Sequence, residues 1–211
     1  MKEVVAKYDD LAERLTKKPV DGVDGTLFRG ISLEYLFSDA RLPDLAKLWQ
    51  ALDKGGPLPS KPPAAASDNA PASRPHVLCN DSSWPRDVGA YQANTAADRK
   101  AYPLPGGGTG NVTPCAFWPD PKEKPVGITD KGASNILMVQ NERDPGTPLV
   151  GARKLREALG ERAMMMTADQ GGHGVYPFGT NTCANDAVTT FLVRGERPKK
   201  DLACEAQPAT D

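Results

Sequence analysis

The sequence contains no G-x-S-x-G motif, so the strained strand-to-helix turn that presents a nucleophilic serine is not recognisable in it. It also has no C-x-x-C pair, which leaves His76 and Cys79 as only half of a zinc site. No apolar run is long enough to cross a bilayer, and the net charge of -1 gives no attraction to nucleic acid or anionic membrane. We therefore expect no cofactor or metal, no nucleic acid and no membrane as partners.

The N-terminus lacks a signal-peptide hydrophobic region and starts directly inside a helical pattern. From this we expect a truncation product or an internal start. The 211 residues are enough for one or two domains with a sizeable core.

The four cysteines, Cys79, Cys115, Cys183 and Cys204, each lie in a loop or at a predicted helix end rather than in an apolar stripe. This placement favours two disulfides, and hence an oxidising compartment, over four buried thiols. The sequence alone allows three pairings.

The first quarter of the chain has a helical pattern, and a stretch with few large apolar residues follows it. Apolar residues recur at helical spacing from Val4 to Leu15, from Ile31 to Phe37 and from Leu42 to Leu52. A tight turn is expected at Asp21–Gly25. Residues 57–75 are rich in Pro, Ala, Ser and Lys and predict an exposed linker.

The segment after this linker has weaker signals. We expect a brief extended piece from His76 to Cys79, and a helix from Arg86 to Tyr102 with Pro85 near its first turn. The run Gly106–Gly108 lacks the flanking strand and helix of a phosphate-binding loop, so we interpret it as a flexible loop.

The last third of the chain has the order strand, helix, strand, helix. The continuous apolar run Ile136–Gln140 and the stretch Ala163–Thr167 predict two buried strands, which the intervening helix should make parallel. That helix is expected to have Thr147 as N-cap and Pro148 as first residue, and to end at Gly160. Its inward face would be formed by Leu149, Ala152, Leu155 and Leu159, and a final helix would bury Ala187, Val188, Phe191 and Leu192.

Two residues with catalytic chemistry follow these predicted strands. Asp144 lies on the loop after the first strand, and His173 lies in Gly171–Gly174 after the second. Ligands collect at the carboxyl edge of parallel sheets, and an Asp that accepts from imidazole Nδ1 leaves Nε2 free to take a proton from a hydroxyl. The spacing favours a triad acid and base over a loop-capping Asp and an ordinary surface His.

Four segments together resemble the C-terminal region of secreted actinobacterial tripeptidyl aminopeptidases, which are serine peptidases of the α/β-hydrolase fold. The first two are Asn141–Pro148 and Gly172–Tyr176 around the Asp and the His. The others are the C-x-D-x-x-W-P-R-D-like stretch at 79–87 and the N-x-x-P-C-x-x-W-P-like stretch at 111–119. The tail from Asn181 to Pro198, followed by Cys204, is similar as well.

This resemblance implies an α/β fold that comprises the C-terminal portion of an α/β-hydrolase, with a helical cap and the final two parallel strands. Residues 1–56 would be a helical cap segment, 57–75 a flexible linker, 76–134 a cap or connecting segment with a disulfide, and 135–211 the core segment. With nearest-neighbour order, it predicts the pairs Cys79–Cys115 and Cys183–Cys204. The exposed faces of the core segment would be covered by the chain's own helices, by an absent N-terminal half or by a second copy.

The resemblance also implies roles for single residues. Asp144 would orient His173, which would act as general base and then acid on a peptide with a free N-terminus. Glu142, Asp81 and Asp87 are candidates for binding the substrate's cationic amine, although solvated loop carboxylates explain them more simply. Without a nucleophile the chain alone is expected to be inactive, and a hidden nucleophile would be sought at Ser32, Ser134 and Thr180. The alternatives are part of a secreted esterase or other small-molecule hydrolase, and a non-catalytic peptide-binding cap module.

Overall fold

The computed structural model describes residues 2–58, 69–102 and 111–207. Within them the chain forms two compact units, residues 1–32 with 46–126 and residues 33–45 with 127–211. The predicted loop Gly106–Gly108 and the middle of the predicted linker lie outside the described residues. Among the helices that are described, none combines the length and apolar character of a transmembrane span.

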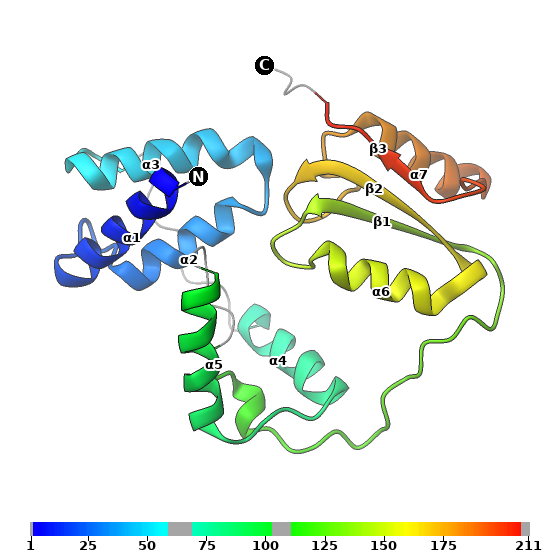
Figure 1. The fold of residues 1–211 in the computed structure, drawn as a ribbon, viewed down its shortest axis with the longest axis horizontal. Coiled ribbons are helices and arrows are strands. Elements are labelled where there is room, and N and C mark those ends of the chain that lie inside the picture. Colours follow the sequence, from blue (N-terminus) through cyan, green and yellow to red (C-terminus); the bar gives the residue numbers. More distant parts are fainter. Residues whose placement is uncertain (1, 59–68, 103–110, 208–211) are drawn as a thin grey trace. The chain divides into compact units, whose positions relative to one another are not determined.

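The first unit contains most of a group of three helices, α1 (Lys2–Lys17), α2 (Gly25–Tyr35) and α3 (Leu42–Lys54) (Figure 1). The rings of Tyr8, Phe28 and Trp49 meet at its core with centroids 5.3–5.8 Å apart. The prediction that the second helix starts at Ile31 is wrong. The Asp24 carboxylate accepts hydrogen bonds from Thr26 N–H and Leu27 N–H, and α2 starts six residues earlier, at Gly25.

The rest of the first unit contains α4 (Asn69–Asp81), α5 (Val88–Ala101) and the 3-10 turn η2 (Pro114–Phe117). The end of the predicted linker and the predicted extended piece at 76–79 are therefore helical. Pro75 opposes this helix, but the disulfide from Cys79 to Cys115 and the edge contact of His76 with Trp118, at 4.9 Å, hold it in place. The disulfide was expected, but the contact of His76 with Trp118 was not.

The start of α5 also differs from the prediction. The helix begins at Val88, because the Asp87 carboxylate accepts from Gly89 N–H at 2.8 Å and acts as its N-cap. The expected start at Arg86, with Pro85 in the first turn, is wrong.

The second unit is built around a parallel sheet of order β1-β2-β3. Strand β1 (Ile136–Arg143) pairs with β2 (Ala163–Gly171) from Ile136↔Ala163 onward, and β2 pairs with β3 (Leu202–Cys204). Helices α6 (Leu149–Leu159) and α7 (Thr182–Arg194) lie on either side of the sheet (Figure 1). The two predicted strands and their parallel order are confirmed, and a third short strand adds to them.

The core of this unit lies between α7 and one face of the sheet. Its buried residues are Met166, Ala168, Val175, Ala184 and Cys204. The bond between Cys183 and Cys204 joins α7 to β3, so both disulfides have the expected pairing. Leu155 and Leu192, which were expected to face inward, are exposed.

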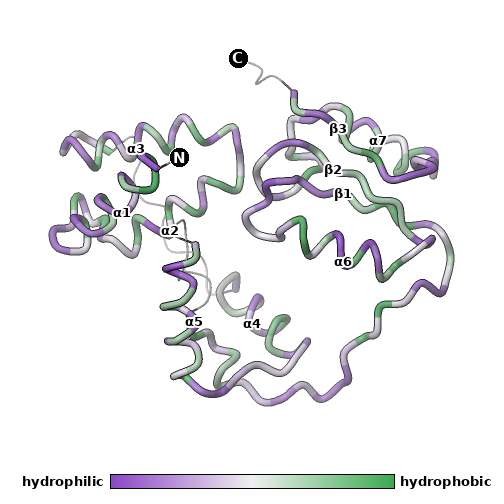
Figure 2. Tube along the Cα trace, in the orientation of Figure 1, coloured by the Kyte–Doolittle hydropathy of each residue, from purple (hydrophilic) through white to green (hydrophobic). Residues whose placement is uncertain are grey.

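Strands β1 and β2 change character along their length. They begin with hydrophobic residues and turn hydrophilic toward their carboxyl ends (Figure 2). The polar ends place hydrogen-bonding side chains at the sheet edge where the site is found.

Candidate active site

Asp144 is the first residue after β1, and its carboxylate organises the loop that leads to α6. Its Oδ1 accepts from Gly146 N–H at 2.7 Å and Thr147 N–H at 2.8 Å, and its Oδ2 accepts from the Thr147 hydroxyl at 3.0 Å. The side chain is only 5% exposed. The Thr147 hydroxyl therefore binds Asp144 instead of capping α6, whose N-cap is Pro148, so the capping prediction is wrong.

His173 reaches the same edge from the end of β2. The parallel register sets Arg143 beside Gly171, so the loops that follow both strands leave the sheet together. Gly172 has φ +87, a left-handed conformation that glycine adopts without strain, and it turns the chain so that the imidazole faces the Asp144 loop.

The two predicted residues are in contact. His173 Nδ1 lies 3.0 Å from each carboxylate oxygen of Asp144, which is hydrogen-bond distance. An Nδ1–H donor satisfies this geometry, because a deprotonated Asp can only accept. Among the residues that the structure describes, Nε2 has no hydrogen-bond partner, and 44% of the His173 side chain is exposed. The ring therefore has one nitrogen held by a buried carboxylate and the other free for a reaction partner.

The electrostatics of the pair keep Asp144 ionised. Burial alone would raise the pKa of its carboxyl group, but hydrogen bonds from Thr147 N–H, Gly146 N–H, His173 and the Thr147 hydroxyl together hold the pKa below its usual value. Asp144 both caps its own loop and holds the imidazole. A loop-capping role and the role of a triad acid are therefore compatible.

A network of buried and half-buried amide side chains lies beneath the two loops. Asn141, 1% exposed, donates from Nδ2 to the carbonyl of Gly172 at 3.0 Å and accepts from Gln170 at 2.8 Å. Gln140 donates to the carbonyl of Thr147 at 2.8 Å, and Gln170 accepts from Asn181 N–H. Sequence analysis missed this network, although three of its four members lie at the carboxyl ends of the two strands, where polar residues interrupt apolar runs.

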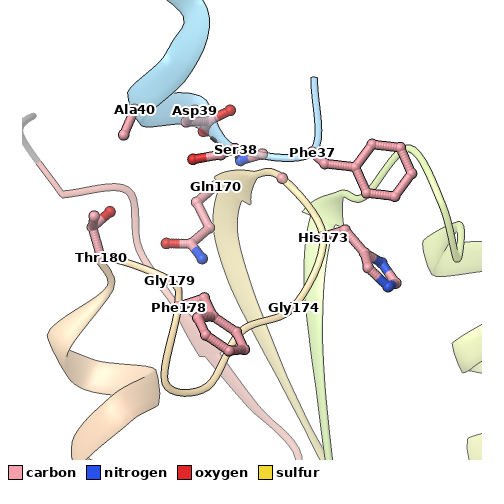
Figure 3. Close-up of a pocket in the computed structure, with 12 residues that line it drawn as sticks. Phe37, Ser38, Asp39, Ala40, Gln170, His173, Gly174, Phe178, Gly179 and Thr180 are labelled. Carbon is pink, nitrogen blue, oxygen red and sulfur yellow. Dashed lines mark hydrogen bonds between the residues drawn. The ribbon is translucent and has the colours of Figure 1, made fainter. Parts of the chain in front are cut away.

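A small cavity of about 70 Å³ lies beside the His173 loop. Its walls come from residues 37–40, 170–174 and 178–180. Figure 3 shows that the imidazole of His173 points away from Asp39 and Thr180, which also line the cavity. The three hydroxyl groups considered as hidden nucleophiles do not bind the imidazole. Ser32 accepts from Trp49, Ser134 donates to a backbone carbonyl, and no bond joins Thr180 to His173 within the described residues.

The proposed amine-binding carboxylates are placed as follows. Glu142 is exposed on β1 and accepts from the Thr167 hydroxyl at 3.3 Å. Asp81 ends α4 and Asp87 caps α5, and both belong to the first unit. Their role in substrate binding stays a prediction. In the part of the chain that the structure covers, no group of three or more His, Cys, Asp or Glu side chains could hold a metal ion.

Comparison with known proteins agrees with this geometry. Residues 106–204 match the family model described as TAP-like protein. The chain is 31% identical over 142 residues to a tripeptidyl aminopeptidase of Streptomyces lividans. The aligned segment covers 66% of this chain and 26% of that protein. It is also 31% identical over 133 residues to carboxylesterase B of Mycobacterium tuberculosis (61% and 25%), and over 91 residues to serine protease Hip1 of the same organism (43% and 17%).

The chain thus spans about a quarter of the length of the first relatives it matches. The matched segment contains Asp144, His173, both helices that flank the sheet and three of the four cysteines. Its parallel sheet and the Asp–His pair at the carboxyl edge fit that assignment. Residues 106–204 thus carry the TAP-like C-terminal part of an α/β-hydrolase.

Proposed function

We propose that Asp144 and His173 are the acid and the base of a Ser-His-Asp triad in a secreted serine aminopeptidase of the tripeptidyl aminopeptidase type. The observation that carries this proposal is the 3.0 Å contact between a buried carboxylate and Nδ1 of an exposed imidazole whose Nε2 is free. The substrate would be a short peptide with a free N-terminus. The two disulfides support an oxidising, extracellular location.

In this mechanism His173 takes the proton of a serine hydroxyl at Nε2 while the hydroxyl oxygen attacks the scissile carbonyl. Asp144 holds the Nδ1–H tautomer and stabilises the imidazolium that forms. His173 then gives the proton to the leaving amine. The same residues serve water attack on the acyl-enzyme in the second half of the reaction.

No G-x-S-x-G occurs in these 211 residues, so no nucleophile elbow is recognisable in them. We therefore propose that the chain is inactive unless another polypeptide segment brings the serine and the oxyanion hole to Nε2. Such a segment, an N-terminal half or another chain, would be its principal partner.

The first test uses the purified chain. Tripeptidyl and aminoacyl anilides should release no chromophore above the level of a His173→Ala control, because the proposal assigns both the nucleophile and the oxyanion hole to another segment. Turnover that depends on His173 would show that a nucleophile is present, and Ser32, Ser134 and Thr180 would then be replaced one at a time.

The second test uses the polypeptide encoded by the complete gene. It should cleave tripeptidyl anilides with a free amine. Asp144→Asn should lower kcat by about 10⁴ and His173→Ala by about 10⁶. An esterase is the second candidate, favoured by the similarity to carboxylesterase B. Preference for acyl esters over free-amine anilides would select it, and binding of peptides without turnover would indicate a non-catalytic module.

A further inference from the structure

A segment far from the site in sequence forms two hydrogen bonds with the backbone of the His173 loop. The carbonyl of Phe37 accepts from His173 N–H at 2.9 Å. The Asp39 carboxylate accepts from Gly171 N–H at 2.6 Å, across 132 residues of sequence. Figure 3 shows residues Phe37 to Asp39 lying over the loop that leaves β2. All of these residues belong to the second unit.

The side chain of Phe37 also touches the imidazole. The two rings meet edge to face with centroids 5.3 Å apart and an interplanar angle of 68°. A methyl group on Gly146 would lie 3.0 Å from the Phe37 ring and 3.1 Å from His173 Nδ1. Phe37 therefore fills the space beside the imidazole on the side of the Asp144 loop and limits the rotation of the ring.

The His173 loop has little stiffness of its own, because Gly171, Gly172 and Gly174 surround the histidine. Its carbonyl groups are held from below by Asn141, which donates to both Gly171 and Gly172. The residues at 37–39 bind the N–H groups of the same loop. The loop is therefore held through its carbonyl groups by Asn141 of the sheet and through its N–H groups by residues 37–39, which are not part of the sheet.

We propose that Phe37 and Asp39 are positioning residues that hold the His173 imidazole against Asp144. This inference rests on the proposed role of His173 as the catalytic base. Asp39 fixes the backbone two residues before the histidine, and Phe37 fixes both the histidine N–H and the plane of its ring. Together they set which nitrogen faces the carboxylate and which faces outward.

The experiment follows His173 by NMR in the full chain. In Asp39→Ala, hydrogen exchange of the Gly171 amide should accelerate about tenfold, and the Nδ1–H resonance should broaden as the ring gains freedom. Asp39→Asn should restore both signals, because the amide oxygen still accepts from Gly171. Phe37→Leu should broaden the Nδ1–H resonance while the carbonyl of residue 37 keeps its backbone bond. The matched control is Asp186→Ala on the exposed face of α7.

The signals separate the two proposals. An Nδ1–H resonance that is unchanged in both Asp39→Ala and Phe37→Leu would overturn the positioning role. A general loss of protection in β2 in either variant would show a structural role only and would overturn it too. A wild-type chain with the hydrogen on Nε2 instead of Nδ1 would contradict the proposed function of His173 itself.

Discussion

Replacement of Asn141 by alanine tests how much the buried amide network contributes to the second unit. Asn141 Nδ2 donates to Gly172 O at 3.0 Å and more weakly to Gly171 O at 3.4 Å, and its Oδ1 accepts from Gln170 Nε2 at 2.8 Å. Truncation leaves the Gly172 carbonyl and the Gln170 amide without these partners. An unpaired buried carbonyl such as that of Gly172 costs about 1–3 kcal/mol, and the half-buried Gln170 amide adds a smaller cost, so the free energy of unfolding should fall by about 3 kcal/mol.

A loss of this size is a large share of the 5–15 kcal/mol that is typical of domains. All three tryptophans, Trp49, Trp84 and Trp118, belong to the first unit, so their fluorescence would not follow the unit that is perturbed. Native-state hydrogen exchange of the β1 and β2 amides measures the free energy of unfolding of the second unit directly.

The exposed Asn135, just before β1, provides the matched control, and Asn135→Ala should change the free energy of unfolding by less than about 0.5 kcal/mol. A loss below about 1 kcal/mol in Asn141→Ala would refute the reasoning, because it would mean that water replaces the amide without cost.

Three further outcomes are expected. The double variant Cys183→Ser with Cys204→Ser should lose about 3 kcal/mol in urea unfolding, the entropy of a loop closed across 21 residues; a loss near zero would show that the unfolded chain is already restricted. Because the pKa of Asp144 is lowered on folding, its contribution to stability is complete above the usual carboxyl value of 3.8 and disappears as pH falls through the folded-state value. Urea midpoints measured from about pH 5 to pH 2 should therefore fall more steeply in wild type than in Asp144→Asn, and parallel curves would contradict this. Gly172→Ala should cost about 2 kcal/mol, since alanine is strained at φ +87 and its Cβ would lie 2.9 Å from Phe37 O; an unchanged melting temperature would mean that the loop relaxes freely.

The Asp–His pair could be predicted from the sequence because it depends on a local rule. An apolar run, a helix and a second apolar run predict adjacent parallel strands, and their carboxyl ends then share one edge. Once that topology was expected, Asp144 and His173 had to lie near each other. The disulfide pairs followed from the resemblance together with nearest-neighbour order.

The features that were missed depend on contacts between distant residues. Asp39 lies 132 residues before its partner Gly171, and no spacing rule links them. Helix α4 contains Pro75, which disfavours a helix, and its partners Cys115 and Trp118 lie more than 30 residues later in the sequence. Strand β3 has three residues and no periodicity to detect.

The central claim is that Asp144 holds His173 in the tautomer that a triad base requires. The most direct measurement is the ¹⁵N shift of the two His173 ring nitrogens at about pH 8, where an ordinary imidazole is neutral. The account predicts a protonated Nδ1 and a bare Nε2 in the wild-type chain, and a shift toward the Nε2–H tautomer in Asp144→Asn. A wild-type His173 with its hydrogen mainly on Nε2, or a tautomer ratio that Asp144→Asn leaves unchanged, would contradict it.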